Sequence, residues 1–210
     1  MPGMGLRSAP SLEGRFSRLV ALGLDHAESL ARAADDPEVW RFLPYGPADT
    51  PETMRVLIRE LLDRWTAGTD VPFTVLALPG DLPIGMTRYL EIDRTHRRLE
   101  IGGTWFDAAH RRTPVNTETK FLLLRHAFEN EGANRVQFKT DLRNLRSQSA
   151  IERIGATREG VLRDHMVMPD GFLRSSVLYS ITAAEWPSIR VRLEGLLSRP
   201  WNGRGAAASA

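Results

Sequence analysis

The chain has 210 residues, of which 42% are hydrophobic and 26% are charged, and its formal net charge is +2 at pH 7. This length and apolar content suit one globular domain with a buried core, and the small net charge gives no indication of nucleic-acid binding. The sequence contains no cysteine, which excludes a cysteine nucleophile, thiolate metal sites and disulfides. Because we find no apolar leader segment and no stretch long enough to span a bilayer, we expect a cytoplasmic protein that does not bind membranes.

The first part of the chain predicts a strand followed by two helices. Residues 1–13, rich in Gly, Pro and Ser, are expected to form a flexible lead, and residues 15–22 have the pattern of a strand. Asp25, with Glu28 three residues later, has the spacing of a capping box and predicts the start of the first helix. Thr50-Pro51 is a typical helix start, and the apolar spacing behind it predicts a second helix over 51–67.

Strands and a further helix follow. Residues 72–78, 84–92 and 98–106 predict strands, and we expect the last of these to place Leu99, Ile101 and Trp105 on one face and Glu100, Thr104 and Phe106 on the other. Gly102 and Gly103 in this strand predict a bulge or a close backbone approach, although packing alone could require them. In the helix predicted over 116–131, we expect Glu118 to face outward, and Gly132 ends the helix.

The remaining segments complete a mixed α/β fold. We predict a strand over 135–141, a short helix ending near Ile154, strands over 157–168 and 173–182, and a helix over 185–197. Residues 14–198 are therefore expected to form one domain, and residues 199–210 a disordered tail. This order predicts a central mixed sheet of about six to seven strands with helices on both faces.

Two segments carry the chemistry. The segment from His110 to Glu118 lies where a strand leads into a helix, so unpaired N–H groups and the positive end of the helix dipole coincide there. Such a site binds phosphate, and the guanidinium groups of Arg111 and Arg112 suit phosphate oxygens. The alternative is a helix start with arginines in water. The second segment, Asn144-Leu145-Arg146-Ser147, begins another short helix that ends at Gly155.

Together these segments resemble the GNAT N-acetyltransferase superfamily over residues 14–182. One pattern is Glu100-Ile101-Gly102 leading to Trp105-Phe106, and another is Asn144-x-x-Ser147. The third is the family's pyrophosphate loop, Gln/Arg-x-x-Gly-x-Gly/Ala, in which Arg111 matches the first position while Pro114 and Asn116 replace the later small residues. The chain is most similar to the branch that contains ribosomal-protein N-terminal acetyltransferases, which also contains enzymes acting on small amines.

The resemblance implies a GNAT fold with a V-shaped opening in the sheet for coenzyme A. It implies acetyl-CoA as cosubstrate, direct transfer of the acetyl group to a primary amine of a protein N-terminus or a small molecule, and a homodimer. The five histidines show no metal-ligand spacing, so no metal is expected, and the small net charge predicts no direct contact with nucleic acid. The residues expected to hold acetyl-CoA are Trp105, Phe106, Arg111, Arg112, Thr113, Val115, Asn116, Thr117, Asn144 and Ser147.

Three residues are candidates for catalysis. Ser147 is the candidate acid that protonates the leaving thiolate, and Asn144 would position the reacting groups. The alternative is that Asn144 caps its helix and Ser147 is a surface residue. Glu100 is the candidate base, provided that partial burial raises its pKa. It could instead orient the acceptor's ammonium group or pair with an arginine.

An aromatic loop and an arginine are candidates for binding the acceptor. Trp40 and Tyr45 lie between the first two helices, where the family usually builds its acceptor wall, and Arg88 could meet an acidic group on the acceptor. The alternative, which the residues taken singly favour, is that each belongs to the core or the surface.

Two other functions remain open at this point. Pro114 has no N–H to offer a phosphate, which favours a GNAT-like module that binds coenzyme A or a protein partner without catalysis. Alternatively, the aromatic loop and the arginines could dock a protein terminus on the ribosome, so that partner binding matters more than turnover. Proline is well accommodated in the first turn of a helix, which argues against the module without catalysis.

Overall fold

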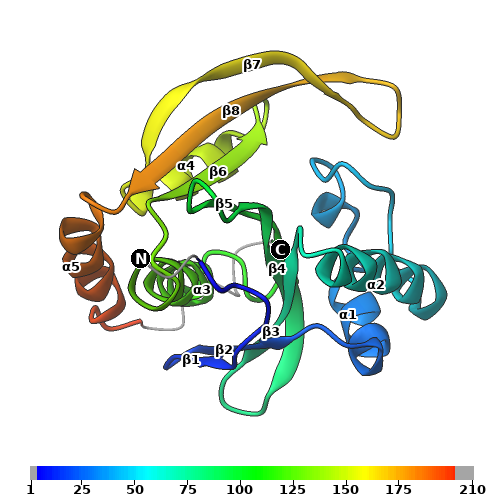
Figure 1. Ribbon diagram of the computed structural model, residues 1–210. Helices are drawn as coiled ribbons and strands as arrows, with labels where there is room; N and C mark the ends of the chain where they lie inside the picture. The colour runs from blue at the N-terminus through cyan, green and yellow to red at the C-terminus, as the bar shows by residue number, and fades with distance from the viewer. Residues whose placement is uncertain (1–3, 202–210) are drawn as a thin grey trace.

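Eight strands form one mixed sheet in the order β1-β2-β3-β4-β5-β6-β8-β7 (Figure 1). The computed structural model describes residues 4–201. The strands are β1 (Leu12–Glu13), β2 (Ser17–Ala21), β3 (Val71–Ala77), β4 (Leu82–Asp93), β5 (Arg98–Phe106), β6 (Arg135–Asp141), β7 (Thr157–Val167) and β8 (Leu173–Thr182). The helices are α1 (Ala27–Ala33), α2 (Pro51–Thr66), α3 (Pro114–Arg125), α4 (Leu145–Arg153) and α5 (Trp186–Leu197). Shorter helical segments are η1 (Leu24–His26), η2 (Pro37–Val39) and η3 (His126–Asn130). The mixed α/β prediction is confirmed, with a higher strand count than expected.

The sheet opens between β5 and β6, which are its one parallel pair among the described strands. These strands pair only from Arg98↔Arg135 to Glu100↔Gln137, although β5 continues to Phe106. Beyond that point β6 keeps its antiparallel pairing with β8, down to Asp141↔Ser176. β5 and β6 therefore diverge, and the V-shaped opening is present.

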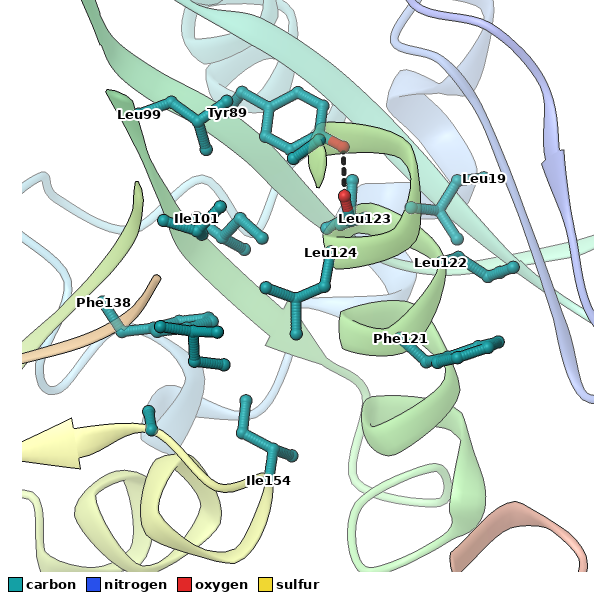
Figure 2. Close-up of a cluster of buried hydrophobic side chains, with 14 of the residues drawn as sticks. Leu19, Tyr89, Leu99, Ile101, Phe121, Leu122, Leu123, Leu124, Phe138 and Ile154 are labelled. Carbon is teal, nitrogen blue, oxygen red and sulfur yellow. Dashed lines mark hydrogen bonds between the residues drawn. The ribbon is translucent and has the colours of Figure 1, made fainter. Parts of the chain in front are cut away.

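Helices cover both faces of the sheet (Figure 1). On one face α3 and α5 pack over a core to which Leu99 and Ile101 of β5 contribute. Figure 2 shows this core, where the Tyr89 hydroxyl donates a hydrogen bond to the Leu123 carbonyl at 2.7 Å. On the other face α1 and α2 pack over a second core that includes Met86. The two cores hold the sheet between the helices.

A bulge in β5 changes which face its last residues occupy. Met86 of β4 lies opposite Trp105 and Arg88 lies opposite Gly102, so β5 has one residue more than β4 over this stretch. Gly103 has φ +58°, a conformation that suits glycine. As a result Trp105 packs with α1 and α2 while Phe106 packs with the core under α3. The predicted bulge is confirmed, but the assignment of Trp105 and Phe106 to faces was wrong because simple alternation does not cross a bulge.

The two predicted helix starts have different outcomes. Thr50 caps α2 through its Oγ1, which accepts a hydrogen bond from the Thr53 N–H at 3.2 Å. The capping box at Asp25 and Glu28 was wrong, because Asp25 lies inside η1. The Gly23 N–H instead donates to Nδ1 of His26 at 3.2 Å, so an imidazole takes the place of the expected carboxylate.

Residues 4–13 are not a loose lead. Met4 and Leu6 are buried in the core under α3, and the Trp65 indole N–H donates to the Arg7 carbonyl at 2.9 Å. The apolar side chains in this Gly- and Pro-rich stretch find partners that lie far away in sequence.

The predicted disordered tail lies outside the described residues from position 202 onward. None of the helices described over residues 4–201 is long and apolar enough to cross a membrane.

Glu118 faces the core, contrary to the prediction that it faces outward. Its carboxylate accepts hydrogen bonds from the backbone N–H groups of Arg15, Phe16 and Ser17 at 2.7–2.8 Å and from the Ser17 hydroxyl at 2.9 Å. A Cβ atom at Gly14 would lie 2.3 Å from the carboxylate carbon, so a larger residue at this position would displace the carboxylate from these hydrogen bonds. Glu118 therefore fixes α3 to the start of β2.

Candidate active site

A cleft of about 1330 Å³ runs through the opening between β5 and β6. It is lined from β5, from the loop before α3, from α4 and from the segment between α1 and α2. Of the residues predicted to bind ligands or to act in catalysis, the cleft brings together Tyr45, Arg88, Glu100, Trp105, Phe106, Arg111, Arg112, Thr113, Asn116, Thr117, Asn144 and Ser147.

Two predicted site residues, Trp40 and Val115, are not among the residues that line the cleft. Val115 is buried in the core, and its N–H donates to Oγ1 of Thr113 at 3.3 Å. Trp40 is buried in the second core, and its indole N–H donates to the Ala34 carbonyl at 2.9 Å. Its ring packs against Trp105 and Tyr45 at centroid distances of 5.9 and 6.3 Å. Trp40 therefore supports two cleft residues from behind.

The N-terminus of α3 is one end of the cleft. Thr113 is the N-cap and Pro114 occupies the first helical position, where its missing N–H costs no hydrogen bond within the helix. The first turn of α3 contains no acidic residue, so its partial positive charge is unopposed there. Asn116 and Thr117 line the cleft at this end, and Arg112 is exposed beside them. This arrangement suits an anion such as a phosphate.

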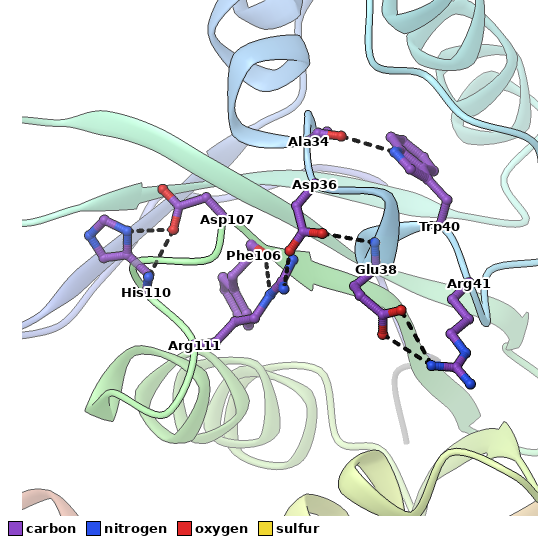
Figure 3. Close-up of polar contacts among 9 residues, drawn as sticks. All are labelled: Ala34, Asp36, Glu38, Trp40, Arg41, Phe106, Asp107, His110 and Arg111. Atoms are coloured by element: carbon purple, nitrogen blue, oxygen red, sulfur yellow. Dashed lines mark hydrogen bonds and ion pairs between the residues drawn. The ribbon is translucent and has the colours of Figure 1, made fainter. Parts of the chain in front are cut away.

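Arg111 joins this loop to the segment after α1 (Figure 3). Its Nη1 donates to Oδ2 of Asp36 at 2.5 Å and its Nε donates to the Phe106 carbonyl at 3.2 Å. Asp36 also accepts a hydrogen bond from the Glu38 N–H at 2.9 Å, and this bond, together with Arg111, lowers the pKa of Asp36. Nη2 of Arg111 is buried and has no hydrogen-bond partner among residues 4–201.

Asn144 and Ser147 stand at the start of α4. Oδ1 of Asn144 accepts a hydrogen bond from the Ser147 N–H at 3.0 Å, which makes Asn144 the N-cap. Both residues are half-buried and line the cleft. The hydrogen bond from Asn144 fixes the backbone that carries the Ser147 hydroxyl. Asn144 can therefore cap the helix while Ser147 takes part in the site.

Glu100 is the buried carboxylate of the cleft. It is 3% exposed, and its Oε2 lies 3.0 Å from Nε2 of Gln137 and 3.3 Å from Nζ of Lys139. Burial raises the pKa of Glu100, and the nearby Lys139 ammonium offsets this only in part. The ion pair anticipated with an arginine is made with a lysine. A carboxylate with a raised pKa is a stronger base than an ordinary one, which suits it to accept a proton.

Sequence reasoning missed Lys120 of α3. Its Nζ donates to Oγ1 of Thr104 at 2.5 Å and lies 5.9 Å from the centroid of the Phe138 ring. Burial lowers the pKa of Lys120 to about 7. The one available signal was composition, because Lys120 and Lys139 are the only lysines among 28 Lys and Arg residues.

A second missed residue, Asp70, lies with Arg88 on the α2 side of the cleft. Oδ2 of Asp70 and Nε of Arg88 are 3.2 Å apart and both side chains are buried. The pair is attracted by charge but is not aligned as a hydrogen bond, because neither atom has a hydrogen-bond partner among residues 4–201. The buried Tyr45 hydroxyl likewise has no partner within that range, and the Arg88 guanidinium lies 5.9 Å from its ring. This end of the cleft therefore presents polar atoms that a ligand could satisfy.

A sheet opened between parallel strands, with a helix N-terminus at one end of the opening and a buried carboxylate beside it, is an arrangement that suits an acyltransferase. Residues 18–157 match the family model described as an acetyltransferase (GNAT) domain, and the chain belongs to this family. It is an N-acetyltransferase, as its relatives are named.

Similar proteins agree with this assignment. A crystal structure of a "putative acetyltransferase" from T. thermophilus is 43% identical, covers 89% of this chain and 96% of its own, and has a TM-score of 0.81. The "Putative ribosomal N-acetyltransferase YdaF" of Bacillus subtilis is 31% identical over 49% of this chain and 55% of its own length. The structure of Mycobacterium smegmatis RimJ in complex with CoA-disulfide covers 93% of this chain and 97% of its own with a TM-score of 0.78, and at 19% identity it shows the shared fold.

Proposed function

We propose that this chain transfers an acetyl group from acetyl-CoA directly to a primary amine of a protein N-terminus or a small molecule. The observation that carries the proposal is the opening between β5 and β6, which leads to a helix N-terminus without an acidic residue in its first turn. Membership of the GNAT family supports acetyl-CoA as the donor. Pro114, which favoured an inactive module, lies at the helical position where proline is best accommodated.

The cofactor would lie along the opening. The pyrophosphate would meet the backbone N–H of Asn116, which as the third helical residue has no partner within the helix, the unpartnered Nη2 of Arg111 and the exposed Arg112. The pantetheine arm would follow β5 from Thr104 to Phe106, where the strand has lost its β6 partner and has backbone groups to offer.

Transfer would need two proton movements. Glu100 would accept the proton of the acceptor's ammonium group, directly or through a water, and its raised pKa supports this role. The neutral amine would attack the thioester carbonyl, a C–N bond would form and the C–S bond would break. The Ser147 hydroxyl would donate its proton to the thiolate and take up, directly or through a water, the second proton that the attacking nitrogen loses, so no alkoxide remains. The Asn144 cap would hold Ser147 in place.

The acceptor would enter from the side of Tyr45 and Arg88. Asp70 and Arg88 offer one buried oxygen and one buried nitrogen, so an amine with an adjacent carbonyl or amide could satisfy both. A protein N-terminus has this chemistry, and the name of the ribosomal relative supports it. Residence in the cytoplasm and a homodimer remain part of the proposal.

Release of free thiol from acetyl-CoA tests this function. We expect release to require an amine and to be faster with N-terminal peptides than with N-acetylated controls of the same sequence. The Glu100→Gln variant should lose most of the rate and lose the acidic limb of the pH profile. Binding of acetyl-CoA with no thiol release for any peptide or small amine would instead support the inactive module.

A further inference from the structure

Lys120 lies in the opening of the sheet, and the acetyl-transfer scheme does not use it. Its Nζ contacts Thr104 of β5 at 2.5 Å and lies 5.9 Å from the Phe138 ring of β6. Both residues come after Glu100↔Gln137, the last pair that joins the two strands. Nζ therefore lies between the diverging strands, at the Thr104 end of the proposed pantetheine path, which is the end that would carry the thioester.

The surroundings of Lys120 favour the neutral amine. The side chain is buried, 7% exposed, and among the described residues its Nζ has a hydroxyl as hydrogen-bond partner and no carboxylate in an ion pair. Burial lowers its pKa to about 7 even though Glu100 acts in the opposite direction. A large share of Lys120 is therefore a nucleophilic amine at neutral pH.

Lys139 is a contrasting lysine in the same cleft. Its Nζ pairs with Glu91 at 2.8 Å and with Glu100 at 3.3 Å. Although burial acts to lower the pKa of Lys139, these carboxylates outweigh it and the pKa is raised. Lys139 is thus held as the ammonium form, which has no lone pair for attack.

We propose that Lys120 is a self-acetylation site, which accepts the acetyl group of acetyl-CoA bound in the same molecule when no acceptor amine occupies the cleft. The inference rests on the proposed function, because it needs acetyl-CoA along Thr104 to Phe106. The lone pair of Nζ attacks the thioester carbonyl, a C–N bond forms and the C–S bond breaks. The proton lost by Nζ goes to the thiolate, through Ser147 or water, so the products are N-acetyl-lysine and free coenzyme A.

Acetylation would change the opening itself. The modified side chain is longer, uncharged and unable to ionise, and it occupies the gap beside Thr104 where the pantetheine arm is proposed to lie. Self-acetylation therefore lowers the affinity for acetyl-CoA, and an acceptor amine protects the enzyme by consuming the acetyl group first.

The test is mass spectrometry of the full chain incubated with acetyl-CoA and no amine. Cleavage after arginine separates the two lysines, because Lys120 falls in residues 113–125 and Lys139 in residues 136–143. We expect one acetyl group on Lys120, with a first-order rate that does not depend on protein concentration. Lys139 is the internal control, and from the opposite pKa shifts its acetylation should be at least about a hundredfold slower. In urea, where the site is lost, the two lysines should react alike.

The outcomes separate the inference from the function on which it rests. Acetylation of Lys120 that disappears in the Lys120→Arg variant supports self-acetylation. Equal labelling of both lysines, or no label on Lys120 in a protein that releases thiol with an amine, overturns it and leaves the proposed function intact. A protein that neither binds acetyl-CoA nor releases thiol overturns both. The comparison of Lys120 with Lys139 in the unmodified protein remains valid even if the Lys120→Arg variant fails to fold.

Discussion

Asp36 and Arg111 are joined by a hydrogen bond of 2.5 Å although they lie 75 positions apart in sequence. Asp36 belongs to the segment that leads to the proposed acceptor side of the cleft, and Arg111 belongs to the loop proposed to bind pyrophosphate (Figure 3). The pair thus connects the two halves of the site. A phosphate that draws Arg111 toward itself competes with Asp36 for the same guanidinium group.

Weakening this pair should change the binding of acetyl-CoA and of the acceptor in opposite directions. In the Asp36→Asn variant the side chain can still accept from the Glu38 N–H, but it no longer carries the charge that holds Arg111. We expect acetyl-CoA to bind about two- to fivefold more tightly, a gain of about 0.5–1 kcal/mol, and the KM for the acceptor to rise. Calorimetry and steady-state kinetics measure the two effects. Glu38→Gln, which removes only the exposed pair with Arg41, is the control and should change neither value.

Removing the charge of Glu118 should destabilise the fold. Glu118→Gln leaves at least one of the backbone N–H groups at the start of β2 without a good acceptor, and we expect a loss of about 2–3 kcal/mol in the free energy of unfolding. Urea unfolding followed by circular dichroism measures it. Glu129→Gln, at a half-exposed position in η3, should cost less than about 1 kcal/mol. Equal losses in the two variants would contradict the role given to Glu118.

The hydroxyl of Ser147 should matter to turnover more than to binding. Ser147→Ala keeps the backbone N–H that Asn144 caps and removes only the proposed proton donor. We expect kcat to fall about 10²–10⁴-fold while the Kd for acetyl-CoA changes little. Ser149→Ala, two positions along the same helix, is the matched control and should behave like the unchanged enzyme. A parallel fall in affinity and kcat for Ser147→Ala would show a binding role instead.

Lys120 should make stability depend on pH in the alkaline range. Its pKa falls from 10.5 in the unfolded chain to about 7 in the folded protein, so between these values the unfolded chain binds a proton that the folded one does not. The free energy of unfolding therefore decreases as the pH falls from about 10.5 to about 7 and levels off below that. Lys120→Met removes this effect and should stabilise the protein by a few kcal/mol at pH 7, with a smaller difference at pH 10. A difference that is constant with pH would contradict a buried, neutral Lys120.

Local patterns in the sequence were sufficient for most of the fold. The strands at 98–106, 135–141 and 173–182 match β5, β6 and β8, and Gly132 ends the α3 region with φ +65° as expected. Turn residues, caps and periodicity act between neighbours, so one sequence shows them. The loop before α3 was predicted for the same reason, because the start of a helix is a local pattern in the sequence.

The errors concern interactions between distant residues. The outward prediction for Glu118 failed because its partners, Arg15 to Ser17, lie about a hundred positions away. Trp40 was placed in the acceptor wall because no local pattern shows that its ring packs in the core against Trp105 of β5. Lys120 was overlooked because helical spacing does not reveal that two strands part beside it. Patterns within one segment of the sequence do not reveal contacts between segments.

The most direct test of the account is the thermal stability of the purified protein with acetyl-CoA, compared with equal concentrations of ADP and acetate. At about a hundred times its Kd, acetyl-CoA should add roughly 2.7 kcal/mol of stability, which raises the Tm by a few degrees for a domain of this size. We expect this rise with acetyl-CoA and a much smaller one with the controls. An unchanged Tm at millimolar acetyl-CoA would contradict the assignment of the opening between β5 and β6 as the cofactor site, and with it the roles given to Ser147 and Glu100.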